Sequence, residues 1–212
     1  MIEPFRKLGV AVEFYSVYYD GCLKIDIDIK DDINCVLWCN YFGFAQKMPD
    51  FSSFIDRGGV LIEDITHSFY SMSQYHKQSQ YLVASLRKWE PISCGGYCAS
   101  VDGNFLLRPK CIPPDEFLAQ KQKAMEAKTA YLCGNDSIDK LQLLSDYAES
   151  NAWLAENYSG LKIDKDSENF LHSANQDAER SQRIKNAKRL YQGIKTNGNV
   201  RFLFDEDKID CP

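Results

Sequence analysis

The chain lacks a long hydrophobic run. No apolar stretch approaches the roughly 18 residues that a membrane-spanning helix needs, so the sequence predicts no membrane segment. The first residues, Met-Ile-Glu-Pro-Phe-Arg-Lys, also lack the basic and then apolar pattern of a secretory signal. We therefore expect a cytoplasmic protein.

The chain also lacks a surplus of positive charge. Its net charge is −5, with acidic and basic residues interspersed, which argues against a dedicated nucleic-acid binder because such proteins need a basic face for phosphate. No internal repeat and no low-complexity segment is evident. With 212 residues, of which 44% are apolar, the sequence predicts a folded protein with one large domain or one domain and a fragment.

Eight cysteines are present, but no Cys-x-x-Cys pair is among them. A zinc site built from Cys94, Cys98 and a histidine is one interpretation of their positions. The absence of a Cys-x-x-Cys pair argues against it. A disulfide framework is typical of shorter secreted chains. Several of these cysteines lie within apolar runs, as Cys35 and Cys39 do around Val-Leu-Trp, so we expect small buried side chains and no metal.

Short apolar runs separated by turn residues dominate the first half of the chain. The predicted strands are residues 10–15, 33–39, 60–63, 81–84 and 96–100. The nearly continuous apolar runs at 33–39 and 60–63 are typical of parallel strands buried on both faces, whereas 96–100 follows its neighbour closely enough to return antiparallel. The alternating residues 23–29 fit a short edge strand or an extended lead-in equally well. A short helix is predicted over residues 51–57.

Helical patterns follow Pro113 and Pro114. Apolar residues recur with helical spacing up to Gly134, and a second helix is predicted from about residue 136 to Gly160. A third is predicted from about residue 166 to 196, with a strand at residues 200–204 after it. The predicted fold class is therefore α/β, with a mostly parallel sheet that has one antiparallel strand, followed by three helices.

Four polar residues come at or just past the ends of two predicted strands. Asp64 and His67 follow the strand at 60–63, and Ser85 and Lys88 follow the strand at 81–84. In open α/β sheets, the carboxyl ends of the strands are where ligands bind. A lysine with a lowered pKa forms Schiff bases, and a pyridoxal phosphate site also needs a carboxylate for the pyridine nitrogen. On spacing alone, a surface lysine and a capping aspartate explain the pattern better.

The stretch from Gly58 to Gly96 resembles the DegT-type sugar aminotransferases, which use pyridoxal phosphate and have the aspartate-aminotransferase fold. The family pattern has an acidic residue and aspartate, then a small residue and His or Gln, and here this is Glu-Asp-Ile-Thr-His at 63–67. A strand then ends in a serine near the Schiff-base lysine, with a Gly-Gly several residues later, and here these are Ser85, Lys88 and the pair at 95–96. Weaker counterparts exist at residues 4–9, 41–43 and 183–187.

The resemblance implies roles for these residues. Lys88 is the expected Schiff-base lysine and proton carrier, and Asp64 the partner of the pyridine nitrogen. His67 is expected against the cofactor ring, and Ser85 near the phosphate or the lysine. The implied partners are an amino-acid donor, a keto sugar that is nucleotide-linked, and a second copy of the chain in a homodimer or other self-association.

The chain also departs from the family pattern. Members of the family are longer than this chain. In them, a loop rich in Gly, Ser and Thr holds the cofactor phosphate, and this loop precedes the part of the sequence that begins with Pro4 here. Many members carry the serine where this chain has Val83. We expect residues 1–196 to be a partial large domain and 197–212 the start of a truncated small domain. The alternative function is a non-catalytic fragment or binding module of the same fold.

Overall fold

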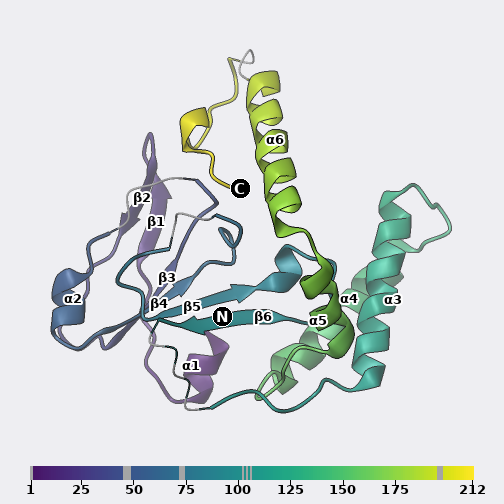
Figure 1. The fold of residues 1–212 in the computed structure, drawn as a ribbon, viewed down its shortest axis with the longest axis horizontal. Coiled ribbons are helices and arrows are strands. Elements are labelled where there is room, and N and C mark those ends of the chain that lie inside the picture. Colours follow the sequence, from purple (N-terminus) through teal and green to yellow (C-terminus); the bar gives the residue numbers. More distant parts are fainter. Residues whose placement is uncertain are drawn as a thin grey trace.

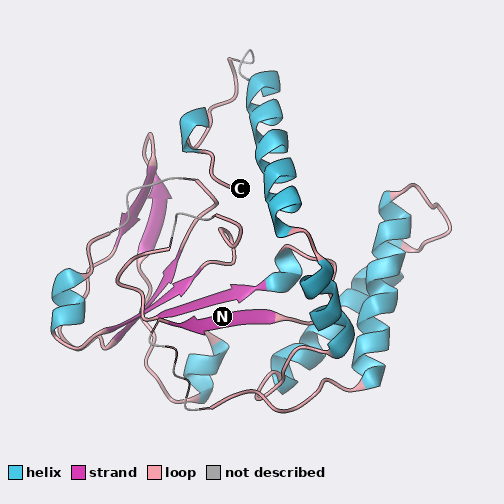
Figure 2. Cartoon of the chain, viewed as in Figure 1, coloured by secondary structure: helices cyan, strands magenta, loops and turns pink. Residues whose placement is uncertain are grey.

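The computed structural model describes residues 2–212 apart from 45–48, 72–74, 102, 104, 106 and 195–197. A four-stranded sheet lies at its centre, and a separate two-stranded hairpin lies beside it (Figures 1 and 2). The sheet consists of β3 (Cys35–Cys39), β4 (Val60–Asp64), β5 (Tyr81–Ser85) and β6 (Gly96–Ser100), in that spatial order. The hairpin consists of β1 (Ser16–Tyr19) and β2 (Leu23–Asp26).

The sheet has the predicted mixed topology. β3 pairs parallel to β4, and β4 pairs parallel to β5, whereas β6 returns antiparallel to β5. The α/β class with a mostly parallel sheet is thus confirmed. The register places Asp64 opposite Cys39 on one side and Val83 on the other, so three strands deliver their carboxyl ends to one edge.

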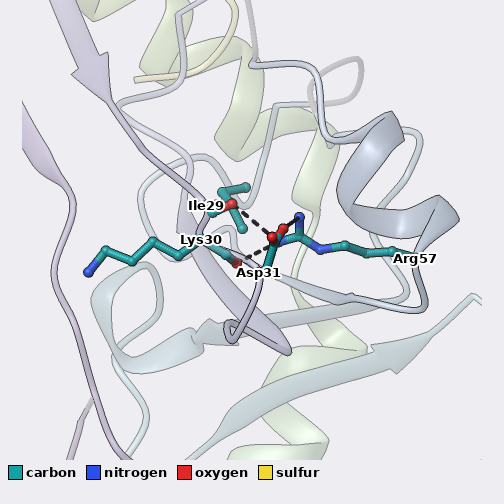
Figure 3. A network of polar contacts seen from close by, with 4 residues as sticks. All are labelled: Ile29, Lys30, Asp31 and Arg57. Atoms are coloured by element: carbon teal, nitrogen blue, oxygen red, sulfur yellow. Dashed lines mark hydrogen bonds and ion pairs between the residues drawn. The ribbon is translucent and has the colours of Figure 1, made fainter.

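The hydrophobic core lies between β3, β4 and the helix that connects them, α2 (Ser52–Asp56). Trp38 and Leu61 are fully buried, and the ring of Phe51 meets the Trp38 ring edge-on with centres 5.9 Å apart. Arg57, which follows α2, donates to the carbonyls of Ile29 and Lys30 and pairs with Asp31 (Figure 3). These contacts fasten the end of α2 to the segment after β2.

The helices after Pro114 differ from the prediction in number. In the part of the chain that the structure describes, there are four α-helices after Pro114: α3 (Asp115–Leu132), α4 (Lys140–Asn157), α5 (Lys165–Ser173) and α6 (Gln176–Ile194). The predicted single third helix is wrong, because Ala174 is extended and the side chain of Asn175 accepts a hydrogen bond from the N–H of Ala178 at 3.0 Å. Asn175 therefore acts as an N-cap that starts a new helix. The predicted end near residue 196 lies outside the described residues.

Two predicted strands are also wrong. Residues 10–15 form no strand, and the first strand begins at Ser16. Residues 200–204 form no strand either, and a short 3-10 helix, η2 (Glu206–Lys208), follows them. At the amino end, the short helix α1 (Glu3–Lys7) precedes the hairpin.

The last residues of the chain pack back against the loop after β3. The N–H groups of Asp210 and Cys211 both donate to the carbonyl of Gly43, and Asp210 pairs with Arg180 of α6 at 2.5 Å. Cys211 is fully buried there. The carboxyl-terminal segment and α6 thus form one packed unit with the loop that follows β3 (Figure 1).

Candidate functional site

Asp64 ends β4 as a buried carboxylate, with only 2% of the residue exposed. Its Oδ1 atom accepts a hydrogen bond from the N–H of Thr66 at 2.8 Å, which forms a tight turn after the strand. The backbone carbonyl of Asp64 accepts from the N–H of Asn40 in the neighbouring loop. Asp64 is therefore rigidly held at the carboxyl edge of the sheet.

Thr66 joins the two halves of the predicted site. Its Oγ1 atom accepts from the N–H of Ser85 at 2.9 Å, and its carbonyl accepts from the indole N–H of Trp89 at 2.6 Å. The turn that carries Asp64 is thus bonded to both ends of the 3-10 helix η1 (Leu86–Lys88), which follows β5. Thr66 was not among the predicted site residues, and its position between a strand-end aspartate and His67 is the only local signal for it.

His67 is exposed and lies against two aromatic rings of the loop after β3. The imidazole stacks on the Tyr41 ring with centres 5.9 Å apart, and the Phe42 ring meets it edge-on at 5.5 Å. These contacts orient the imidazole through packing. Its predicted place against a cofactor ring stays a prediction.

Lys88 and Ser85 line one wall of a cavity of about 910 Å³ between η1 and the helix pair α3–α4. Lys88 is exposed and Ser85 half-buried. Neither Asp64 nor His67 belongs to the described residues that line this cavity. The structure therefore brings Ser85 and Lys88 to one cavity, and it holds Asp64 nearby through Thr66 but outside that wall.

The same cavity is lined by cationic side chains that are not among the predicted site residues. Arg87 comes from η1, and Lys121 and Lys128 come from α3. Burial and then the positive charges of Arg87, Lys128 and Lys88 lower the pKa of Lys121 to about 8. Burial also lowers the pKa of Arg87. The helical spacing of Lys121 and Lys128, seven residues apart, is the sequence signal that could have found this pair.

Glu63, which precedes Asp64 in the sequence, has a structural role that the sequence pattern did not reveal. It is fully buried, and its carboxylate accepts from the amide of Asn40 at 2.9 Å, the N–H of His76 at 2.6 Å and the hydroxyl of Ser79 at 2.8 Å. The network ties β4 to the loop after β3 and to the segment before β5. Such a satisfied buried carboxylate stabilises the fold and is closed to a ligand.

The cysteines are free thiols, but only Cys94 and Cys211 are buried. The prediction of small buried side chains is therefore wrong for most of them, including Cys35. The Sγ atom of Cys94 donates to Asp164, the N-cap of α5, at 3.1 Å, whereas Cys98 is exposed on β6. Within the described parts of the chain, no group of three or more histidine, cysteine or acidic side chains is arranged to hold a metal ion.

Comparison with known proteins adds no relative. No family model matches the chain, and neither a curated protein nor a solved structure matches it. Among the residues that the structure describes, no helix is both long enough and apolar enough to cross a membrane.

Proposed function

We propose that the chain is a pyridoxal-phosphate-dependent aminotransferase-like protein. It transfers an amino group from an amino acid to a keto sugar that is nucleotide-linked, in polysaccharide or cell-surface sugar biosynthesis. The observation that carries the proposal is the pair of hydrogen bonds through Thr66, which hold the strand-end turns of Asp64 and Lys88 together. Asp64 and Lys88 are the two residues to which the sequence pattern assigns direct contacts with the cofactor.

The residues present fit the cofactor in chemical type. Lys88 offers an exposed amine at the wall of a large cavity, as a Schiff-base lysine needs. Asp64 offers a buried carboxylate at the end of the adjacent strand, suited to a pyridinium nitrogen. When bound, pyridoxal phosphate supplies the electron sink for amino-group transfer, and Lys88 moves the proton. Ser85 and His67 are proposed to orient the bound group.

The proposal is tested by incubating the purified protein with pyridoxal phosphate. A yellow covalent adduct is expected, which borohydride fixes on Lys88 and peptide mass spectrometry locates. A Lys88→Ala variant should lose the adduct. Lys123→Ala is the matched control, because Lys123 is exposed and does not line the cavity. Absence of any Lys88 adduct at saturating cofactor would refute the proposal.

A non-catalytic binding module of the same fold is the second candidate. The observation in its favour is that Asp64 and His67 lie outside the described wall of the cavity that Lys88 lines. A half-reaction assay separates the two: the catalytic function requires an amino-acid donor to convert the bound cofactor to its amine form, and Asp64→Asn should slow that conversion. A binding module retains the adduct without conversion.

A further inference from the structure

The cavity between η1 and the α3–α4 pair has a strongly cationic wall. Among the residues that the structure describes, four cations line it: Arg87, Lys88, Lys121 and Lys128. Two carboxylates, Glu3 and Glu90, line it as well, which leaves the described lining with a surplus of two positive formal charges. Glu90 is itself buried and accepts a hydrogen bond from the Tyr70 hydroxyl.

Lys121 is the most deeply placed of these cations, with 5% of the residue exposed. Its ammonium donates to the Ser150 hydroxyl at 3.2 Å and to the Asn151 side-chain oxygen at 2.9 Å, and it lies 4.7 Å from the centre of the Tyr147 ring. Both hydrogen-bond partners are neutral. An ammonium has three N–H donors, and these two hydrogen bonds use two of them.

None of the four cations forms an ion pair with a carboxylate within the part of the chain that the structure describes. A buried cation without a counter-charge is unfavourable, and gathering further cations around it raises that cost. The lowered pKa of Lys121 has the same cause. An anion in the cavity relieves both effects, because it supplies the missing negative charge.

The apolar residues in the rest of the cavity wall indicate what kind of organic group the anion carries. Met125, Leu132 and Leu154 line the cavity together with the cations. The lining therefore has a cationic part on η1 and one face of α3, and an apolar part on the facing sides of α3 and α4. A single carboxylate would balance only one charge of the surplus, whereas a phosphate group balances about two and offers several acceptor oxygens.

We propose that this cavity binds a phosphate ester, with the phosphate among Arg87, Lys121 and Lys128 and the apolar organic part against Met125 and Leu154. Arginine and lysine are both suited to this role, the first through its fork of donors and the second as a compact charge. The proposal requires no Schiff base at Lys88. It therefore does not depend on the proposed aminotransferase function, although both place a ligand in the same cavity.

Isothermal titration with phenyl phosphate and with inorganic phosphate tests this site on the full chain. We expect saturable binding of phenyl phosphate, about tenfold tighter than that of inorganic phosphate because of its apolar ring. Benzoate, which carries a single negative charge, should bind at least about tenfold more weakly than phenyl phosphate. Equal affinity for benzoate, or no saturable binding of phenyl phosphate at millimolar concentration, overturns the proposal.

Two variants locate the site. Lys121→Met should weaken phenyl phosphate binding at least about tenfold, and Lys128→Gln, which alters an exposed residue and spares the fold, about threefold or more. Lys123→Met lies on the same helix outside the cavity lining and should leave the affinity unchanged. Unchanged affinity in Lys128→Gln, or an equal loss in Lys123→Met, contradicts the assigned site.

Proton uptake gives a readout that a merely structural role of Lys121 would not produce. A bound phosphate stabilises the protonated amine, so binding raises the Lys121 pKa from about 8 and the complex takes up protons above that pH. Titrations at pH 8.5 in two buffers of different ionisation enthalpy should show this uptake for the unmodified chain and not for Lys121→Met. Phenyl phosphate carries no aldehyde, so it reports on the phosphate site alone. If phenyl phosphate binds but pyridoxal phosphate forms no Lys88 adduct, only the aminotransferase proposal is refuted. A Lys88 adduct without phenyl phosphate binding refutes only the phosphate site.

Discussion

The hydroxyl oxygen of Thr66 accepts a hydrogen bond from the backbone N–H of Ser85 at 2.9 Å. This bond crosses from the turn after β4 to the end of β5, where the ladder between these two parallel strands no longer pairs residues. It fixes where η1 begins, and thereby where Lys88 projects relative to Asp64. Thr66, which lies between Asp64 and His67 in the chain, thus links the predicted pair at the end of β4 to the pair at the end of β5.

Replacing Thr66 with valine should destabilise the protein by about 1–2 kcal/mol, because the Ser85 N–H loses its acceptor in a half-buried setting. Urea unfolding followed by circular dichroism measures the change. Thr66→Ser retains the hydroxyl and should stay close to the unmodified protein. Equal stability of the valine and serine variants would show that the bond does not contribute.

Replacing Glu63 with glutamine should cost about 1–3 kcal/mol in the free energy of unfolding. The carboxylate accepts three hydrogen bonds, and an amide nitrogen in place of one oxygen would face the donors of His76 and Ser79 or of Asn40. Glu156→Gln on the exposed surface of α4 is the control, with an expected change below about 0.5 kcal/mol. Matching midpoints and slopes for the two variants would contradict this role.

Replacing Gly43 with alanine should release the carboxyl-terminal segment. Gly43 has φ +78°, and a Cβ atom built there would collide with the backbone carbonyl of Cys211. We expect faster proteolytic cleavage after residue 204 and loss of Cys211 protection from thiol reagents.

Gly193→Ala provides the opposite control for that substitution. Gly193 lies inside α6, and a Cβ atom there would meet no neighbour within 4 Å, so alanine should stabilise the helix by about 0.5–1 kcal/mol. If Gly43→Ala leaves cleavage and thiol protection unchanged, the packing of the last residues against Gly43 is not needed to hold them.

The chain should self-associate through its amino-terminal region. Phe14 is 75% exposed, and both Tyr18 and Tyr19 of the hairpin are about half exposed, while β3 forms an edge of the described sheet. Exposed apolar groups beside an edge strand favour pairing between copies. Sedimentation velocity should show association that increases with protein concentration.

Phe14→Glu should weaken this association, since it places a charge in the exposed apolar region. Leu107→Glu introduces the same charge at another strongly exposed apolar residue, outside the hairpin, and should have little effect. A monomer at every concentration, or equal weakening by both variants, would contradict the predicted surface.

The central strands were predictable because their signals are local. The runs that became β3, β4, β5 and β6 are apolar, short and bounded by turn residues, and each lies within a residue or two of its predicted bounds. The antiparallel return of β6 also followed from the short connection to β5. The division into a large domain at 1–196 and a small domain from 197 stays a prediction.

The errors arose where one side chain or one packing contact overrides a pattern. Asn175 interrupts a continuous helical pattern by capping a new helix, and composition alone does not reveal that. Residues 10–15 have strand-forming side chains but no described neighbour that pairs with them as a strand. Strand propensity needs a partner before it becomes a strand.

The sequence by itself determined the strands of the central sheet, the polar residues at their carboxyl ends and the start of α3 at Pro114. These features depend on periodicity, turn residues and helix caps, all of which act over a few neighbouring residues. Only the tertiary structure decided that Lys88 shares a cavity with Lys121 and Lys128, and that Asp64 is tied to it through Thr66. Those relationships depend on how α3 and α4 pack beside η1, which no local pattern in the chain specifies.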